Sequence, residues 1–157
     1  MTIMLLTVGK TDVKWVKEGL DLYISRLRHY VPFHLVEIPE LKKAASLSRQ
    51  QIKDKEGELI LKQVGPSDSL ILLDEHGREC RSLEFAEFLE KQMASGSKNL
   101  VFTVGGAYGF SEPVYQRANA KISLSKMTFS HQMVRTIFAE QLYRAFTILK
   151  GEPYHHE

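Results

Sequence analysis

The alternation of short apolar runs with stretches of helical period most constrains how this chain can fold. The apolar runs are rich in β-branched residues, and some, such as residues 70–73, are continuous, as in strands covered on both faces. Between them, apolar residues recur at three- and four-residue steps, which indicates helices. This alternation is typical of βα units around a parallel sheet. The sequence therefore predicts an α/β fold with a parallel-type sheet of about five or six strands, flanked by helices.

Five strands and five helices follow from this pattern. We expect strands at 2–8, 34–38, 69–73, 100–104 and 122–124, and helices at 12–28, 48–64, 82–95, 111–118 and 131–150. Ser48 with Gln51 fits a capping box, and Ser82 and Ser111 are expected as further N-caps. The 157 residues contain no repeat, low-complexity stretch or convincing linker. We expect residues 1–157 to form a single domain.

Cysteine content and charge narrow the setting and the partners. Cys80 is the only cysteine, which excludes internal disulfides and cysteine-type zinc sites and favours a reducing, cytoplasmic setting. The N-terminal apolar run is too short to span a membrane and lacks a leader pattern, so we expect a first strand and no membrane partner. A net charge of +2 gives little drive for non-specific nucleic-acid binding. An RNA partner would have to be held locally or by shape.

The last expected helix has the clearest apolar stripe, made of Val134, Ile137, Phe138, Leu142, Ala145, Phe146 and Leu149. The stripe favours a core helix over a partner-binding helix, and both roles are compatible in a homodimer. Arg135, Glu140 and Arg144 lie off the stripe. We expect them to face solvent, a partner chain or a ligand.

Two polar loops follow neighbouring strands near the C-terminus. Residues 105–109, Gly-Gly-Ala-Tyr-Gly, come directly after a strand and before a helix, where α/β sheets bind ligands. The loop matches neither the Walker nor the dinucleotide-binding spacing, and a simple tight turn is about equally compatible. Residues 124–131 form the second loop. Its His131 fits a structural or capping role better than a general base.

Several motifs carry a family resemblance. They are VFTVGGAYGF at 101–110, SLSKMTFSHQMVRTIFAEQLYRAF at 123–146 and GEPYHHE at 151–157, with shorter matches VGK at 8–10, KEGELIL at 55–61 and LILLDEHG at 70–77. With these motifs the chain resembles the RlmH family, small SPOUT-class methyltransferases that modify a pseudouridine of bacterial large-subunit ribosomal RNA. The resemblance extends over the whole chain and is most specific at the C-terminal end.

The resemblance implies S-adenosyl-L-methionine as methyl donor, no metal, a homodimer, and a C-terminal trefoil knot that general topology rules would not predict. The implied substrate is N3 of a pseudouridine in 23S ribosomal RNA, on assembled ribosomes. The implied cofactor pocket consists of Leu73, Gly105, Leu124, Ser125, Lys126, Met127, Thr128 and Phe129. The apolar side chains of this set would hold the adenine, and loop amides and carbonyls would bond its edge.

The acceptor nitrogen needs to lose a proton, so we expect a base or a cation near the site. The candidates are His155 for proton removal, Arg144 or Arg135 for RNA phosphate or developing negative charge, and Tyr154 for ordering the tail or stacking on a base. Arginines on a helix are more commonly solvated or ion-paired, so a purely structural role stays open for them.

Other readings of the same features remain open. One is a non-catalytic RNA- or nucleotide-binding module of the same fold, and another is a dimeric interaction protein built around the last helix. The basic residues Lys42, Lys43, Arg49, Lys53 and Lys55 form either a local RNA-facing strip or a solvated helix surface.

Overall fold

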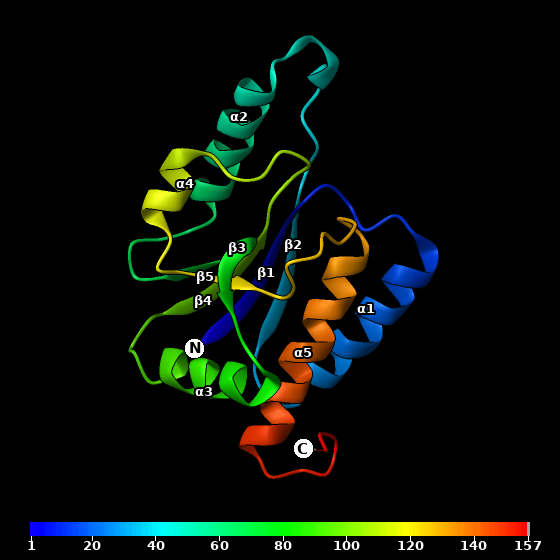
Figure 1. Cartoon of the computed structure of the whole chain (residues 1–157), viewed down its shortest axis with the longest axis vertical. Helices are drawn as coiled ribbons and strands as arrows, with labels where there is room; N and C mark the ends of the chain where they lie inside the picture. Colours follow the sequence, from blue (N-terminus) through cyan, green and yellow to red (C-terminus); the bar gives the residue numbers. More distant parts are fainter. Residues whose placement is uncertain (157) are drawn as a thin grey trace.

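A five-stranded parallel sheet forms the centre of the protein in this computed structural model, which describes residues 1–156 (Figure 1). The strand order is β2-β1-β4-β3-β5, and every pairing is parallel. The predicted α/β class is confirmed. The strands are β1 (Thr2–Val8), β2 (Phe33–Ile38), β3 (Ser69–Glu79), β4 (Asn99–Val104) and β5 (Ala120–Ser123).

Helices cover both faces of the sheet. They are α1 (Lys14–Leu27), α2 (Arg49–Lys62), α3 (Ser82–Met93), α4 (Glu112–Arg117) and α5 (Met133–Leu149), with a short 3-10 turn at Ala44–Ser46. One apolar cluster joins β1, β4 and β3 to α1, α3 and α5, and a second joins the opposite face to α2 and α4. Neighbouring strand residues divide between the two clusters, with Leu5 in the first and Leu6 in the second. Each central strand is therefore buried on both faces, which explains the continuous apolar runs.

The helix starts agree only partly with the expected caps. Ser48 forms the capping box with Gln51 at the start of α2, as predicted. Ser82 is the first residue of α3 and not its cap, so that expectation was wrong. Arg81 takes the cap position, and its backbone amide donates to the Glu84 side chain at 2.8 Å.

β3 extends past the predicted end at residue 73 and folds over β5. Both Leu73 and Arg78 pair with Ile122, so the intervening residues form a bulge across the edge strand. A Cβ on Gly77 would lie 2.7 Å from the Lys121 carbonyl carbon and 2.8 Å from the Ile122 nitrogen. Only glycine allows this close backbone approach.

The strand order creates a crevice at one end of the sheet. β4 lies between β1 and β3 although the chain forms it after both, and its connection to β5 passes over β3. Such reversals open a space beyond the carboxyl ends of the strands. The trefoil knot stays a prediction from the family resemblance. No helix within residues 1–156 is long and apolar enough to cross a membrane.

Candidate active site

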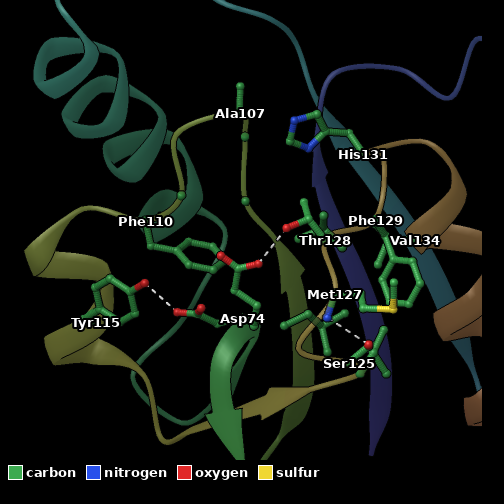
Figure 2. A pocket seen from close by; sticks show the side chains of 17 residues that line it. Asp74, Ala107, Phe110, Tyr115, Ser125, Met127, Thr128, Phe129, His131 and Val134 are labelled. Carbon is green, nitrogen blue, oxygen red and sulfur yellow. Dashed lines mark hydrogen bonds between the residues drawn. The ribbon is translucent and has the colours of Figure 1, made fainter.

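A cavity of about 200 Å³ lies at the carboxyl ends of β3, β4 and β5 (Figure 2). Its lining comes from residues 73–75 of β3, the loop after β4, Tyr115 of α4, the loop between β5 and α5, and Val134 of α5. The apolar part of the lining consists of Leu73, Val104, Phe110, Leu124, Met127, Phe129 and Val134. The polar part consists of Asp74, Glu75, Tyr115, Ser125, Thr128 and His131, beside small residues of the glycine loop.

Seven of the eight residues expected to hold the cofactor line this cavity: Leu73, Gly105, Leu124, Ser125, Met127, Thr128 and Phe129. The eighth, Lys126, lies outside the lining, with its ammonium group 3.5 Å from the Glu79 carboxylate at the surface. The structure thus brings together two loops that the sequence separates by about 20 residues, as the rule for parallel sheets predicts. Cofactor contacts for these residues stay a prediction.

The glycine loop is both a tight turn and a wall of the cavity. The Gly109 amide donates to the Gly106 carbonyl at 3.2 Å, and Gly109 has φ +84°. A Cβ on Gly106 would collide with both carboxyl oxygens of Glu56 on α2. The loop therefore packs directly on a buried carboxyl group, and neither of the two readings of this loop excludes the other.

The loop between β5 and α5 is held by its own polar side chains. Ser125 Oγ accepts from the Met127 amide at 3.0 Å, and Ser123 Oγ donates to the Ser125 carbonyl at 2.9 Å. Thr128 Oγ1 donates to Glu75 at 2.9 Å, which ties the loop to the end of β3. The loop conformation is thus fixed by bonds within the loop and by one bond to β3.

Asp74 and Tyr115 are cavity residues that the sequence reasoning missed. The Tyr115 hydroxyl donates to Asp74 Oδ2 at 2.5 Å. Burial, followed by this hydrogen bond, raises the pKa of Tyr115 above its usual value, so the phenol stays protonated at neutral pH. Asp74 directly follows the continuous apolar run at residues 70–73, and that position was a usable signal. Tyr115 comes from α4, and no sequence pattern pointed to it.

His131, which the sequence placed low among the candidates, lines the cavity. It lies just before α5, where Ser130 Oγ accepts from the Met133 amide at 3.0 Å. Figure 2 shows its imidazole beside the loop that carries Ala107. This position makes His131 a candidate for contact with substrate.

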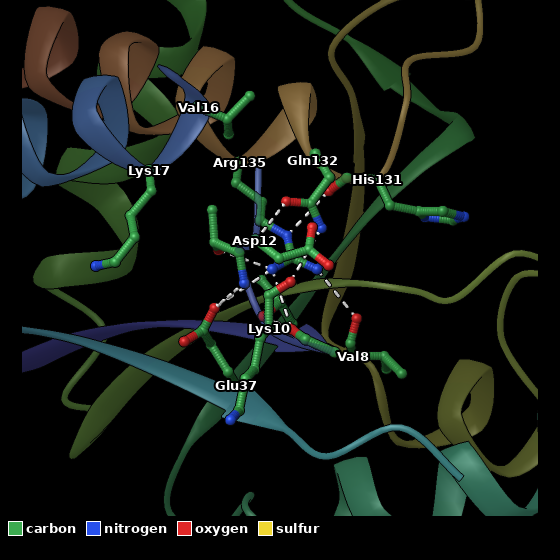
Figure 3. A network of polar contacts seen from close by, with 12 residues as sticks. Val8, Lys10, Asp12, Val16, Lys17, Glu37, His131, Gln132 and Arg135 are labelled. Atoms are coloured by element: carbon green, nitrogen blue, oxygen red, sulfur yellow. Dashed lines mark hydrogen bonds and ion pairs between the residues drawn. The ribbon is translucent and has the colours of Figure 1, made fainter. Parts of the chain in front are cut away.

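Arg135 is buried, contrary to the expectation that it faces solvent, a partner chain or a ligand. It is 1% exposed. Its guanidinium donates to Val8, Gly9 and His131 carbonyls, at 2.9–3.0 Å, and to Thr11 Oγ1 at 2.8 Å (Figure 3). Burial lowers the pKa of this guanidinium, and the nearby Glu37 carboxylate opposes the effect. All of these hydrogen-bond acceptors are groups of the same chain, so Arg135 joins α5 to the end of β1 and is not directed toward a ligand.

The other three candidates form one cluster at the far end of α5. Arg144 lies 3.0 Å from the Glu140 carboxylate, and its Cζ atom lies 4.8 Å from the centre of the Tyr154 ring. The Tyr154 hydroxyl donates to Glu140 at 3.0 Å. Burial, then hydrogen bonds with Tyr23 and Glu140, raise the pKa of Tyr154, which keeps it a donor. Arg144 Nη1 lies 3.0 Å from His155 Nδ1; since arginine can only donate, Nδ1 is the acceptor.

One chain does not bring this cluster to the cavity. Val134 in the first turn of α5 lines the cavity, and none of the cluster residues does. Arg144 is ten residues further along the helix, which corresponds to about 15 Å at 1.5 Å per residue. In Figure 1 the C-terminus lies beyond the end of α5, below the sheet. The cavity and the tail of a single chain therefore lie apart.

Comparison with protein families places this chain in a known family. The model of a family described as "Predicted SPOUT methyltransferase" matches residues 1–155. The chain belongs to the SPOUT methyltransferase family. It is 57% identical to the ribosomal RNA large subunit methyltransferase H of Parabacteroides distasonis, over the full length of both chains. It is 58% identical to the protein of the same name from Christiangramia forsetii, over 99% of each.

A solved structure shows the same fold as this SPOUT methyltransferase. A probable methylase family protein from Haemophilus influenzae aligns with a TM-score of 0.52 and 12% identity, over 99% of this chain and 70% of that one. Within residues 1–156 no group of three or more His, Cys, Asp or Glu side chains is placed to hold a metal ion.

Proposed function

We propose that this SPOUT methyltransferase methylates N3 of a pseudouridine in large-subunit ribosomal RNA, on assembled ribosomes in the cytoplasm. The observation that carries the proposal is the cavity at the ends of β3, β4 and β5. It is lined by seven of the eight positions expected for the cofactor, in a chain more than half identical to ribosomal RNA methyltransferases.

The cavity lining fits S-adenosyl-L-methionine, which when bound supplies an electrophilic methyl group. Apolar side chains such as Leu73 and Leu124 match the faces of an adenine ring. The carboxylates of Asp74 and Glu75 complement a cationic ammonium group and the hydroxyl donors of a ribose. Tyr115 and Thr128 hold these two carboxylates in place.

The acceptor nitrogen carries a proton that must leave as the N–C bond forms. We propose that Arg144 stabilises the negative charge that develops on the pseudouridine base. Tyr154, protonated and bonded to Glu140, is a positioning residue for Arg144. His155 takes the proton on Nδ1 once this nitrogen is released from Arg144, because Nε2 carries the hydrogen of the neutral ring.

This chemistry requires a homodimer, because the tail cluster lies far from the cavity of its own chain. The tail of one protomer would lie over the cavity of the other. Large apolar side chains support such an interface: Trp15 and Leu22 on α1 and Met133 at the start of α5 are exposed in the single chain. These side chains lie on two helices that pack against each other, and apolar surface exposed on one chain is commonly buried at an interface.

The test uses ribosomes from a strain that lacks this gene. Purified protein with labelled S-adenosyl-L-methionine should incorporate label into large-subunit RNA, and mass mapping should place it on one pseudouridine. Cofactor binding without incorporation would favour a non-catalytic binding module. No cofactor binding would reject the proposal.

A further inference from the structure

A second cavity lies on the other side of the glycine loop. It has a volume of about 570 Å³, and its outer part is formed by Arg49, Lys53, His76 and Tyr108. We call this outer part the Tyr108 groove. The two cavities share six lining residues: Asp74, Glu75, Ala107, Gly109, Phe110 and Tyr115. A ligand in the groove would therefore lie next to whatever occupies the cofactor cavity.

An exposed aromatic ring stands in this groove. Tyr108, at the tip of the glycine loop, is 44% exposed. The guanidinium carbon of Arg49 lies 5.1 Å from the centre of its ring, a cation–π distance that restrains the ring. Exposed aromatic side chains beside arginine are the groups on which unpaired nucleic-acid bases stack.

Two cationic side chains, Arg49 and Lys53, line the same groove as the ring. Arg49 begins α2 and Lys53 follows one turn later, so both project from the same side of the helix. Neither forms an ion pair with any acidic side chain in residues 1–156. An arginine and a lysine without acidic partners at the edge of a groove suit a phosphate group.

The acidic side chains of the groove lie at its inner end and are occupied by other groups. Asp74 accepts from Tyr115 and from the His76 amide at 3.0 Å. Glu75 accepts from Thr128. The groove therefore has an acidic inner end that would repel a phosphate and a basic outer end that would attract one.

We propose that the Tyr108 groove binds a single-stranded RNA nucleotide adjacent to the methyl acceptor. Its base stacks on Tyr108 and its phosphate contacts Arg49 and Lys53, while the acceptor base enters the cofactor cavity across the loop. This assignment rests on the proposed function. Of the five basic residues considered for RNA contact between positions 42 and 55, the proposal assigns this role to Arg49 and Lys53.

The test measures the KM for ribosomes and the Kd for S-adenosyl-L-methionine in each of four variants. They are Tyr108→Ala, Tyr108→Phe, Lys53→Ala and, as a matched control, Lys62→Ala, an exposed lysine at the other end of α2 outside the groove. The first measurement is the KM for ribosomes from the deletion strain, and the second is the Kd for S-adenosyl-L-methionine. Tyr108→Ala should raise the ribosome KM about tenfold or more, the usual effect of losing one stacked base.

Tyr108→Phe keeps the ring and should remain near wild type. Lys53→Ala should weaken ribosome binding and reduce the slope of log KM against log salt by about one. Lys62→Ala should change neither. The cofactor Kd should be constant throughout. An unchanged ribosome KM in Tyr108→Ala would overturn the assignment, and so would a cofactor affinity that falls in parallel, because the ring would then only support the loop.

A third measurement separates this proposal from the proposed function. Fluorescence anisotropy with a labelled single-stranded RNA oligonucleotide of about eight nucleotides, at low salt, needs no methyl transfer. If the wild type does not methylate ribosomes but binds this oligonucleotide more tightly than Tyr108→Ala does, the groove stands and the proposed reaction falls. Equal oligonucleotide affinity in the two proteins rejects the groove.

Discussion

Arg135 Nη1 lies 3.4 Å from Glu37 Oε2, an ion pair between α5 and β2 in which the arginine is almost completely buried. Glu37 Oε2 also accepts from the Thr11 amide, and Gln132 bonds the amides of Asp12 and Val13 nearby (Figure 3). The start of α5 is thus tied to the ends of β1 and β2, and the loop between β5 and α5 ends where this network begins.

Arg135→Ala should therefore act on stability. It removes the arginine donor from three backbone carbonyls and from Glu37, which keeps the Thr11 amide. Breaking a buried pair from one side costs about 3–5 kcal/mol, and since Glu37 is 29% exposed we expect the lower end of this range. Urea unfolding should show a loss of this order, and Lys62→Ala should show almost none. A variant of unchanged stability that has lost methyl transfer would make Arg135 a catalytic candidate again.

Gly106→Ala should weaken both stability and cofactor binding, because its Cβ would collide with the Glu56 carboxyl group. Glu56 is only 9% exposed and has little room to move. Combining Gly106→Ala with Glu56→Ala removes the collision, so the double variant should regain cofactor affinity, measured by calorimetry. Additive losses in the double variant would show that the two residues do not contact each other.

Glu56→Gln should stabilise the protein more at high pH than at low pH. Burial, and then the charge of Glu40, raise the pKa of Glu56 above its usual value. A raised carboxyl pKa means that the folded state favours the protonated form, so stability is complete below the unfolded pKa and falls as pH rises through the folded pKa.

One oxygen of Glu56 has no hydrogen-bond partner within residues 1–156, so no donor to that oxygen compensates the charge of the ionised carboxylate, and glutamine removes this charge. Thermal unfolding from pH 4 to pH 8 should show a stability difference between variant and wild type that grows with pH. Glu58→Gln, an exposed position on the same helix, is the control. A difference independent of pH would mean that Glu56 is not the titrating group.

Mixed dimers should recover activity that neither parent has. One parent carries Gly106→Val in the cavity, and the other carries Tyr154→Phe with His155→Ala in the tail. If the tail acts on the partner's cavity, random reassociation at equal concentrations restores about a quarter of the sites. Activity that stays at background in mixtures of correctly folded variants would place both parts of the site in one chain.

His155→Ala alone should lower turnover by about 10²-fold, the lower end of the effect of a general base, and leave the cofactor Kd nearly unchanged. The matched control is His156→Ala, at the exposed neighbouring position, which should leave turnover unchanged. Full turnover in His155→Ala would remove that residue from the mechanism.

Sequence periodicity was sufficient to predict the strands of the sheet and most helix positions, because the spacing of apolar residues depends on which face of each element is buried. The bend of β3 over β5 was not predictable in this way, since the pairing of Arg78 with Ile122 joins distant parts of the chain. The cavity was found because carboxyl ends of parallel strands gather at one edge, and family resemblance supplied its named residues.

Arg135 shows why the remaining site residues were harder to place. Its position off the apolar stripe of α5 suggested exposure, but the long side chain reaches past the helix to the Val8 and Gly9 carbonyls. Only the arrangement of β1 beside α5 reveals those acceptors. Tyr115 was missed for the same reason, since its partner Asp74 is 41 residues away in sequence.

The close contact of Gly77 with β5 cannot form during synthesis until β5 has been made. The bulge of β3 leaves the ribosome before β5, and at roughly 5–20 residues per second the intervening 40 or so residues take several seconds to emerge. For that interval residues 74–79 have no strand to lie on. Their sequence, Asp-Glu-His-Gly-Arg-Glu, is charged and contains no apolar side chain. While it is unpaired, this segment therefore exposes no apolar surface through which nascent chains aggregate.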